Sequence, residues 1–200
     1  MKPKSGGKLQ ESLLRKIIER GCQKVTTSIS KMLHVPVQVS GVVTGFVPIS
    51  RIPMLVENPE GLVTAACVTF TSELSGHMIF MLTSRSWDTA KSFLKPQVSG
   101  REMELSAFAE LANIACSCFI TNLADVTRVV IQFEPPEVME DMSSAVLEDA
   151  LLKFSDVSEL LTVEVIFASD RFEMKGFLFF IPSQESVDLI THHYLQARAQ

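Results

Sequence analysis

The chain has 200 residues, 46% of them apolar, with 18 basic and 23 acidic side chains and a formal net charge of −5. This apolar content excludes a disordered chain, and the length is sufficient to bury a core. The basic residues form no cluster and no apolar run approaches the roughly 20 residues of a membrane-spanning helix, so we expect neither nucleic-acid binding nor a membrane span.

Elements of the first half are predicted from apolar spacing, β-branched residues and turn residues. In chain order they are a helix over 9–33, a strand over 35–49, a loop over 53–61, two strands over 62–72 and 76–84 that form a hairpin, and a short helix over 86–94. Residues 95–100 are expected to connect this half to the next.

The second half repeats this order from Ser99. Ser99 and Glu102 have the spacing of a capping box, which satisfies free N–H groups at the start of a helix. The expected elements are a helix that contains residues 104–119, a strand over 126–136, an amphipathic helix over 139–157, a hairpin of strands over 160–169 and 174–183, and a final helix over 183–197.

The two halves align with each other at an offset of 91 residues, at which 31–39 falls on 122–130. Each half alone would leave an apolar sheet face uncovered, so we expect the halves to merge. The sequence therefore predicts a single domain over 1–200, built from two repeats at about 9–95 and 99–196. The expected fold class is α/β (α+β), with pseudo-twofold symmetry and antiparallel-rich β-sheets flanked by long helices.

The four cysteines all lie within apolar stretches, as small core residues do in a reducing compartment. Cys116 and Cys118 lack the two-residue spacer of a zinc knuckle, so we expect no metal bound by this chain. The polar segment MKPKSGGKLQES at the N-terminus has no apolar core of a signal peptide. These observations predict a cytoplasmic protein.

A narrow polar strip lies on the apolar helix ELSAFAELANIACSCF, residues 104–119. At 100° per residue, its four members fall within about 60° of one another: Ser106, Glu110, Asn113 and Ser117. Four apolar residues fall on the opposite side: Phe108, Ala112, Ala115 and Phe119. One interpretation is the solvent face of an amphipathic helix, and another is a structural role with Asn113 buried.

The chemistry of the strip favours a functional interpretation. It carries one charge, Glu110, where solvent faces usually carry several. The carboxamide of Asn113 is neither a base nor a nucleophile, but it donates and accepts hydrogen bonds at once. It therefore suits the positioning of a water molecule in line with an electrophile that another molecule brings.

These residues resemble the CheC/CheX/FliY family of chemotaxis phosphatases, and CheC in particular. The family pattern is Asp or Ser, three residues, Glu, two residues, Asn, twenty-two residues and Pro, which Ser106, Glu110, Asn113 and Pro136 satisfy. The resemblance implies a CheC-like fold and a hydrolase that removes the phosphoryl group from the aspartate of a CheY-like response regulator, in chemotaxis or two-component signalling. It also implies that the regulator supplies Mg²⁺ and that this chain binds no cofactor.

The resemblance assigns a role to each residue of the pattern. Asn113 would orient the attacking water, and Glu110 would pair with the regulator's lysine near the phosphate. Pro136 would shape the turn into the next helix, and Ser106 would support Glu110 or the start of its own helix.

The first half departs from the family pattern. Glu19 is kept, but Cys22 takes the place of the Asn, Arg15 that of the Asp or Ser, and Gly45 that of the Pro. A thiol lacks the donor and acceptor geometry of an amide. We therefore expect this first site to be inactive and the second half to hold the working site.

The alternative is a non-catalytic flagellar-switch or adaptor domain that binds CheY-like or CheD-like partners without hydrolysis. The intact pair of Glu110 and Asn113 favours the phosphatase. Besides the phosphorylated receiver domain, the expected partners are a CheD-like protein and, if the chain is a homodimer rather than a monomer, a second copy.

Overall fold

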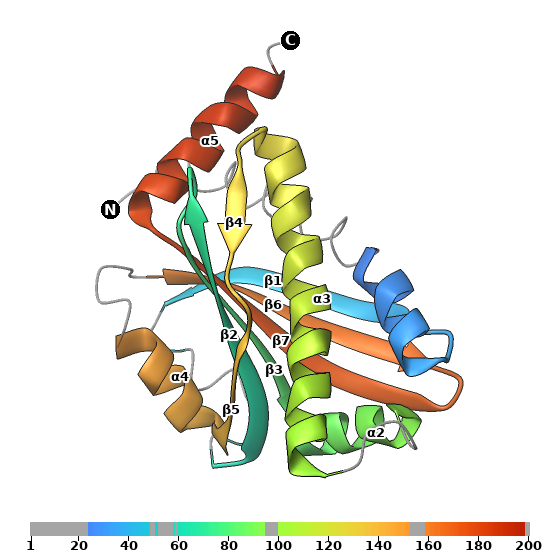
Figure 1. The fold of residues 1–200 in the computed structure, drawn as a ribbon. Coiled ribbons are helices and arrows are strands. Elements are labelled where there is room, and N and C mark those ends of the chain that lie inside the picture. Colours follow the sequence, from blue (N-terminus) through green and yellow to red (C-terminus); the bar gives the residue numbers. More distant parts are fainter. Residues whose placement is uncertain are drawn as a thin grey trace.

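An antiparallel sheet of seven strands forms the centre of the protein in a computed structural model (Figure 1), which describes residues 24–48, 51, 58, 60–94, 100–152 and 159–198. The strands are β1 (Gln38–Pro48), β2 (Leu62–Ser72), β3 (Gly76–Thr83), β4 (Ile131–Phe133), β5 (Glu137–Met142), β6 (Glu159–Ser169) and β7 (Phe172–Pro182). Their order is β1-β6-β7-β3-β2-β4, and β5 also pairs with β2. Residues 24–33 are helical, and four helices follow: α2 (Ser84–Leu94), α3 (Arg101–Thr127), α4 (Ser143–Leu152) and α5 (Gln184–Arg198).

Both predicted hairpins are confirmed as β2–β3 and β6–β7, and the predicted short helix and final helix are confirmed as α2 and α5. Alternation along β2 sends neighbouring side chains to opposite faces of the sheet. Ala66 belongs to the buried cluster beneath residues 24–33, α2 and α3, whereas Ala65 belongs to the cluster beneath α4. The mixed helix and antiparallel-sheet class agrees with the prediction.

Three boundaries in the second half were predicted wrongly. The amphipathic helix was expected from 139, but 137–142 form β5 along β2, and α4 begins only at Ser143. The strand expected over 126–136 is reduced to β4, because α3 continues to Thr127. The helix α3 begins after Gly100, which has no side-chain cap, rather than after Ser99, the predicted capping residue, which lies outside the described residues.

The order of strands in the sheet is symmetric about its centre. From either edge, the opening strand of one half is followed by the hairpin of the other half. Each hairpin pairs through its second strand with the other hairpin, β3 with β7. Each also pairs through its first strand with the opening strand of the other half: β6 with β1, and β2 with β4 and β5. At the centre Ile79 pairs with Phe179, its counterpart at an offset of 100 residues. The division into two repeats within one domain stays a prediction.

Aromatic contacts hold α3 against the sheet. Phe108 is fully buried, with its ring centroid 5.1 Å from that of Trp87 on α2 in an edge-on geometry and 5.8 Å from that of Phe80 on β3. The ring centroid of Phe119, in the second half of the helix, lies 5.0 Å from that of Phe180 on β7. By length and mean hydropathy, 1.3 over an 18-residue window within residues 101–125, α3 also satisfies the criteria for a membrane-crossing helix, but these contacts are those of a core helix in a globular fold.

Gly76 opens β3 at a place where no other side chain fits. Its φ is 151°, and a Cβ there would lie 2.3 Å from the carbonyl oxygen of Ile181. We expect Gly76→Ala to lower the free energy of unfolding by about 2 kcal/mol or more, because the backbone of β7 must move. Urea denaturation measures this, with Gly45→Ala as the control, since a Cβ at Gly45 meets no atom within 4 Å. Equal losses in the two variants would contradict the prediction.

Candidate functional site

The polar strip lies on the surface side of α3. Ser106 and Glu110 are exposed, and Asn113 and Ser117 are half-buried. The opposite side is buried in the core, as predicted: Phe108, Ala112, Ala115 and Phe119. Figure 1 shows α3 in front of the sheet, crossing β6 and β7, so that one side of the helix faces the strands and the other faces away from them. The two-faced helix expected from the residue spacing is therefore confirmed, while the chemical roles of the strip stay predictions.

The two polar side chains at the centre of the strip are not engaged within the described part of the chain. The Glu110 carboxylate forms no ion pair there, and the Asn113 carboxamide forms no hydrogen bond. Asn122, further along the same helix, behaves differently: it is buried and donates from Nδ2 to the carbonyl oxygen of Cys118 at 2.7 Å. Ser117 donates to the Ile114 carbonyl oxygen at 3.2 Å. The amide and carboxylate of the strip therefore keep their hydrogen-bonding capacity for a visiting molecule.

Ion pairs fix the flanks of α3 to its neighbours. Three of them join the helix to other elements: Arg101–Glu140 at 2.8 Å, Lys91–Glu104 at 3.2 Å and Lys24–Asp125 at 3.5 Å. Burial lowers the pKa of Lys91, but hydrogen bonds to Asp88 and Glu104 outweigh it, so the pKa lies above its usual value. Lys91 therefore stays charged and keeps the start of α3 in place, which fixes the orientation of the strip.

Pro136 lies on a different element, and the turn that it shapes differs from the expected one. It is half-buried in the break between β4 and β5, and it leads into β5 rather than into a helix. The last ladder bond before the break runs from Glu134 N–H to the Thr69 carbonyl oxygen at 2.8 Å. Pro135 and Pro136 have no N–H to donate, so the edge strand is interrupted. Because α3 contacts both β4 and β5, this interruption lies beside the helix that carries the strip.

The residues of the degenerate first site, Glu19 and Cys22, lie outside the described residues, as does Arg15. The described part of that helix contacts α3 through Lys24, which pairs with Asp125.

The cysteines on α3 are not candidates for nucleophilic chemistry. Cys116 is completely buried, and burial raises the pKa of its thiol far above the ordinary range. Burial also raises the pKa of the half-buried Cys118. Among the described residues, no group of three or more His, Cys, Asp or Glu side chains is placed to hold a metal ion.

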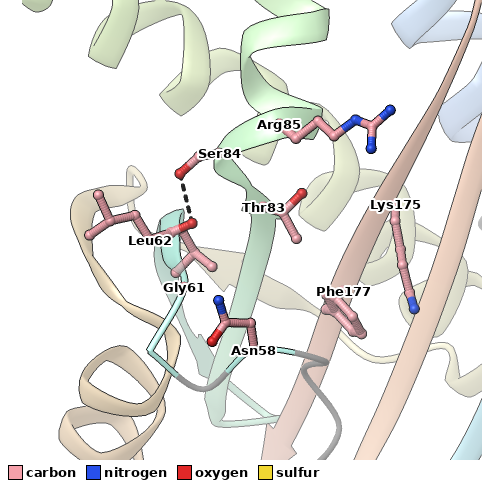
Figure 2. A pocket seen from close by; sticks show the side chains of 9 residues that line it. Asn58, Gly61, Leu62, Thr83, Ser84, Arg85, Lys175 and Phe177 are labelled. Carbon is pink, nitrogen blue, oxygen red and sulfur yellow. Dashed lines mark hydrogen bonds between the residues drawn. The ribbon is translucent and has the colours of Figure 1, made fainter.

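A cavity of about 440 Å³ lies on the α4 side of the sheet (Figure 2). Val63 and Phe177 line its apolar wall and belong to the core cluster beneath α4, and Arg85 and Lys175 also line it. The cavity contains none of the residues predicted from the sequence. Its lining comes from segments more than 100 residues apart, so no local pattern could have indicated it.

Comparisons with known proteins address both the sequence and the fold. The model of the CheC-like family matches residues 103–140, which run from the first turn of α3 to β5. The CheY-P phosphatase CheC of Bacillus subtilis (strain 168) is 26% identical over 129 residues, which span 58% of this chain and 60% of that protein.

Solved structures extend the likeness to nearly the whole chain. FliY of Thermotoga maritima superposes with a TM-score of 0.68 at 15% identity, over 94% of this chain and 96% of that one. The FliM middle domain of H. pylori gives 0.63 at 12% identity over 93% and 98%, and a CheX of Desulfovibrio desulfuricans gives 0.52 at 12% over 82% and 99%. The predicted resemblance to the CheC/CheX/FliY family is therefore confirmed, by sequence over residues 103–140 and by fold over nearly the whole chain.

Proposed function

We propose that the chain is a phosphatase that hydrolyses the aspartyl phosphate of a CheY-like receiver domain in chemotaxis or two-component signalling. The observation that carries the proposal is the solvent-facing pair of Glu110 and Asn113, neither of which is engaged within the described residues. The similarity to a protein named CheY-P phosphatase supports it. The cytoplasm, where receiver domains act, is the proposed location.

The reaction places few demands on this chain. Water attacks phosphorus, the bond from phosphorus to the aspartyl oxygen breaks, the aspartate leaves as a carboxylate, and the protons of the water remain on the released inorganic phosphate. The receiver supplies its own lysine and Mg²⁺, which stabilise the developing charge, so positioning of the water is the missing contribution. The Oδ1 of Asn113 accepts a hydrogen bond from that water while Nδ2 donates to a neighbouring oxygen. A barrier lower by roughly 3 kcal/mol corresponds to about a hundredfold acceleration.

The test measures the decay of a phosphorylated CheY-like receiver with and without the chain. We expect decay about a hundredfold faster at saturation, with dependence on the Mg²⁺ that the receiver binds. An unchanged decay rate in the presence of a chain that binds the receiver would overturn the proposal.

Glu110→Ala is expected to weaken docking and to leave the chemistry nearly intact. Because Glu110 has no ion pair among the described residues, its carboxylate is available for the receiver's lysine. One exposed or half-exposed charge pair contributes about 1 kcal/mol, so KM rises about fivefold while kcat stays within twofold. Glu148→Ala, an exposed carboxylate on α4, serves as the control. A fall in kcat with an unchanged KM would contradict the docking role.

A non-catalytic switch or adaptor function is the second candidate, because the FliM middle domain shares the fold over 93% of this chain. It predicts a chain that binds a receiver or a CheD-like protein while the aspartyl phosphate decays at its own rate. Combined binding and decay measurements on the same samples therefore distinguish the two functions.

A further inference from the structure

The first turns of α3 present an exposed apolar side chain next to the polar strip. Met103 is 48% exposed. At 100° per residue it lies about 20° around the helix from Glu110, two turns further along. Met103 therefore extends the face that carries the strip toward the start of the helix, with an apolar side chain. The residue was not predicted from the sequence, because the family pattern begins at Ser106.

Met103 differs in its position from the other large hydrophobic residues that are exposed in the described part of the chain. Those residues lie on strands or in the segment after α3: Leu62, Val130, Phe133 and Met142. Met142 is a close match in exposure, at 43%, but it lies on β5 beside its cross-strand neighbour Leu62. The two methionines therefore differ mainly in their place on the fold.

The charges around Met103 indicate the kind of surface that it contacts. The cations that the structure describes near the start of α3 are already paired, Lys91 with Asp88 and Glu104, and Arg101 with Glu140. Glu102, which is exposed, forms no ion pair among the described residues, and neither does Glu110. Unpaired carboxylates therefore precede and follow Met103 in the helix, Glu110 about 20° and Glu102 about 100° around the axis from it, which favours a partner surface whose apolar recess is bordered by basic side chains.

Met103 falls within the area that a receiver domain covers when it reaches Asn113. A standard interface buries roughly 800 Å² on each partner, equivalent to a disc about 16 Å in radius. The rise from Met103 to Asn113 along the helix is about 15 Å, and that from Met103 to Glu110 is about 10 Å. A receiver centred on the pair therefore covers Met103 as well.

We propose that Met103 is the apolar anchor of the docking face on α3 and determines which receiver domains bind. This inference rests on the proposed function, because it assigns the receiver as the occupant of the face. Methionine is flexible and polarisable, so it adapts to the shape of an apolar recess, and buried anchors dominate binding energies. The recognised partner is a receiver whose phosphorylation face carries an apolar recess flanked by lysine or arginine.

The test compares Met103→Lys with Met142→Lys in the full-length chain. For Met103→Lys we expect a KM for the phosphorylated receiver at least tenfold higher, with kcat within twofold of the wild type, because the lysine removes the apolar contact and repels the basic rim. Binding of the receiver activated with beryllofluoride should weaken by the same factor. Met142→Lys should change neither quantity, and Met103→Leu should restore most of the affinity.

The outcomes separate this inference from the proposed function. A wild-type KM for Met103→Lys, or an equal loss of affinity in Met142→Lys, overturns the anchor role of Met103. If the wild-type chain accelerates decay in the same experiments, the proposed phosphatase activity is unaffected. If the wild-type chain binds the activated receiver without accelerating decay, the phosphatase fails, and the titration of Met103→Lys still decides whether the anchor exists. Circular dichroism of each variant confirms that the fold is retained.

Discussion

Asn113→Ala will reduce the decay of the phosphorylated receiver to the receiver's own rate, a loss of about a hundredfold in kcat. The substitution removes the group that both accepts from and donates to the water and phosphoryl oxygens, and alanine offers neither. Because Asn113 is half-buried and forms no hydrogen bond within the described residues, its loss leaves no core partner unsatisfied. Binding of the beryllofluoride-activated receiver should change less than threefold.

Asn122→Ala is the matched control, since it removes the same chemical group from the same helix. Asn122 is buried and bonded to the Cys118 carbonyl oxygen, so this variant should lose about 1–2 kcal/mol of stability and keep its kcat. Stopped assays on radiolabelled receiver give the rates, and urea denaturation gives the stabilities. Stimulated decay that survives in Asn113→Ala would show that the amide does not position the water.

Phe108→Ala is expected to have the largest effect on stability, about 3–5 kcal/mol. The ring is fully buried between Trp87 of α2 and Phe80 of β3. Its removal leaves a cavity under the first turns of α3 and removes the edge-on contact with Trp87. The same cavity lets the helix shift, so activity should also fall even in samples that remain folded.

The control for Phe108→Ala is Phe133→Ala on β4, whose side chain is 40% exposed. Because this ring is partly exposed, folding buries less of its apolar area. The variant should therefore lose no more than about 1–2 kcal/mol in free energy of unfolding. Urea midpoints, together with the slope of each transition, measure both losses. Equal losses would mean that Phe108 does not hold α3 to the sheet as its contacts indicate.

Local patterns in the sequence were sufficient for much of the fold and for the face of α3. The spacing from Ser106 to Ser117 placed the strip on the surface side because helical geometry fixes which residues share a face. The hairpins were predictable because alternation and a short turn specify a pairing of neighbours along the chain.

Pairings between distant segments were not predictable in the same way. Residues 137–142 contain acidic residues and methionines that read as the start of a helix, but β2 offers an open edge and the ladder from Leu62 to Cys67 outweighs local propensity. The start of α3 was misplaced by one residue because Gly100 rather than Ser99 precedes it. Met103 was overlooked because an exposed methionine has no pattern of its own and gains meaning only from its neighbours in space.

The crossed pairing of opening strands ties the stability of one end of the chain to that of the other. β1 pairs with β6, from Gln38 with Ala168 to Pro48 with Glu159, so its partners lie 111 to 130 residues later, and β2 depends on β5 for its outer edge. Such contacts form late because long loops must close first, so refolding from urea should be slow, on the order of seconds or tenths of a second. Either half expressed by itself would expose bare strand edges, and co-expression of both fragments should rescue the solubility that each one lacks.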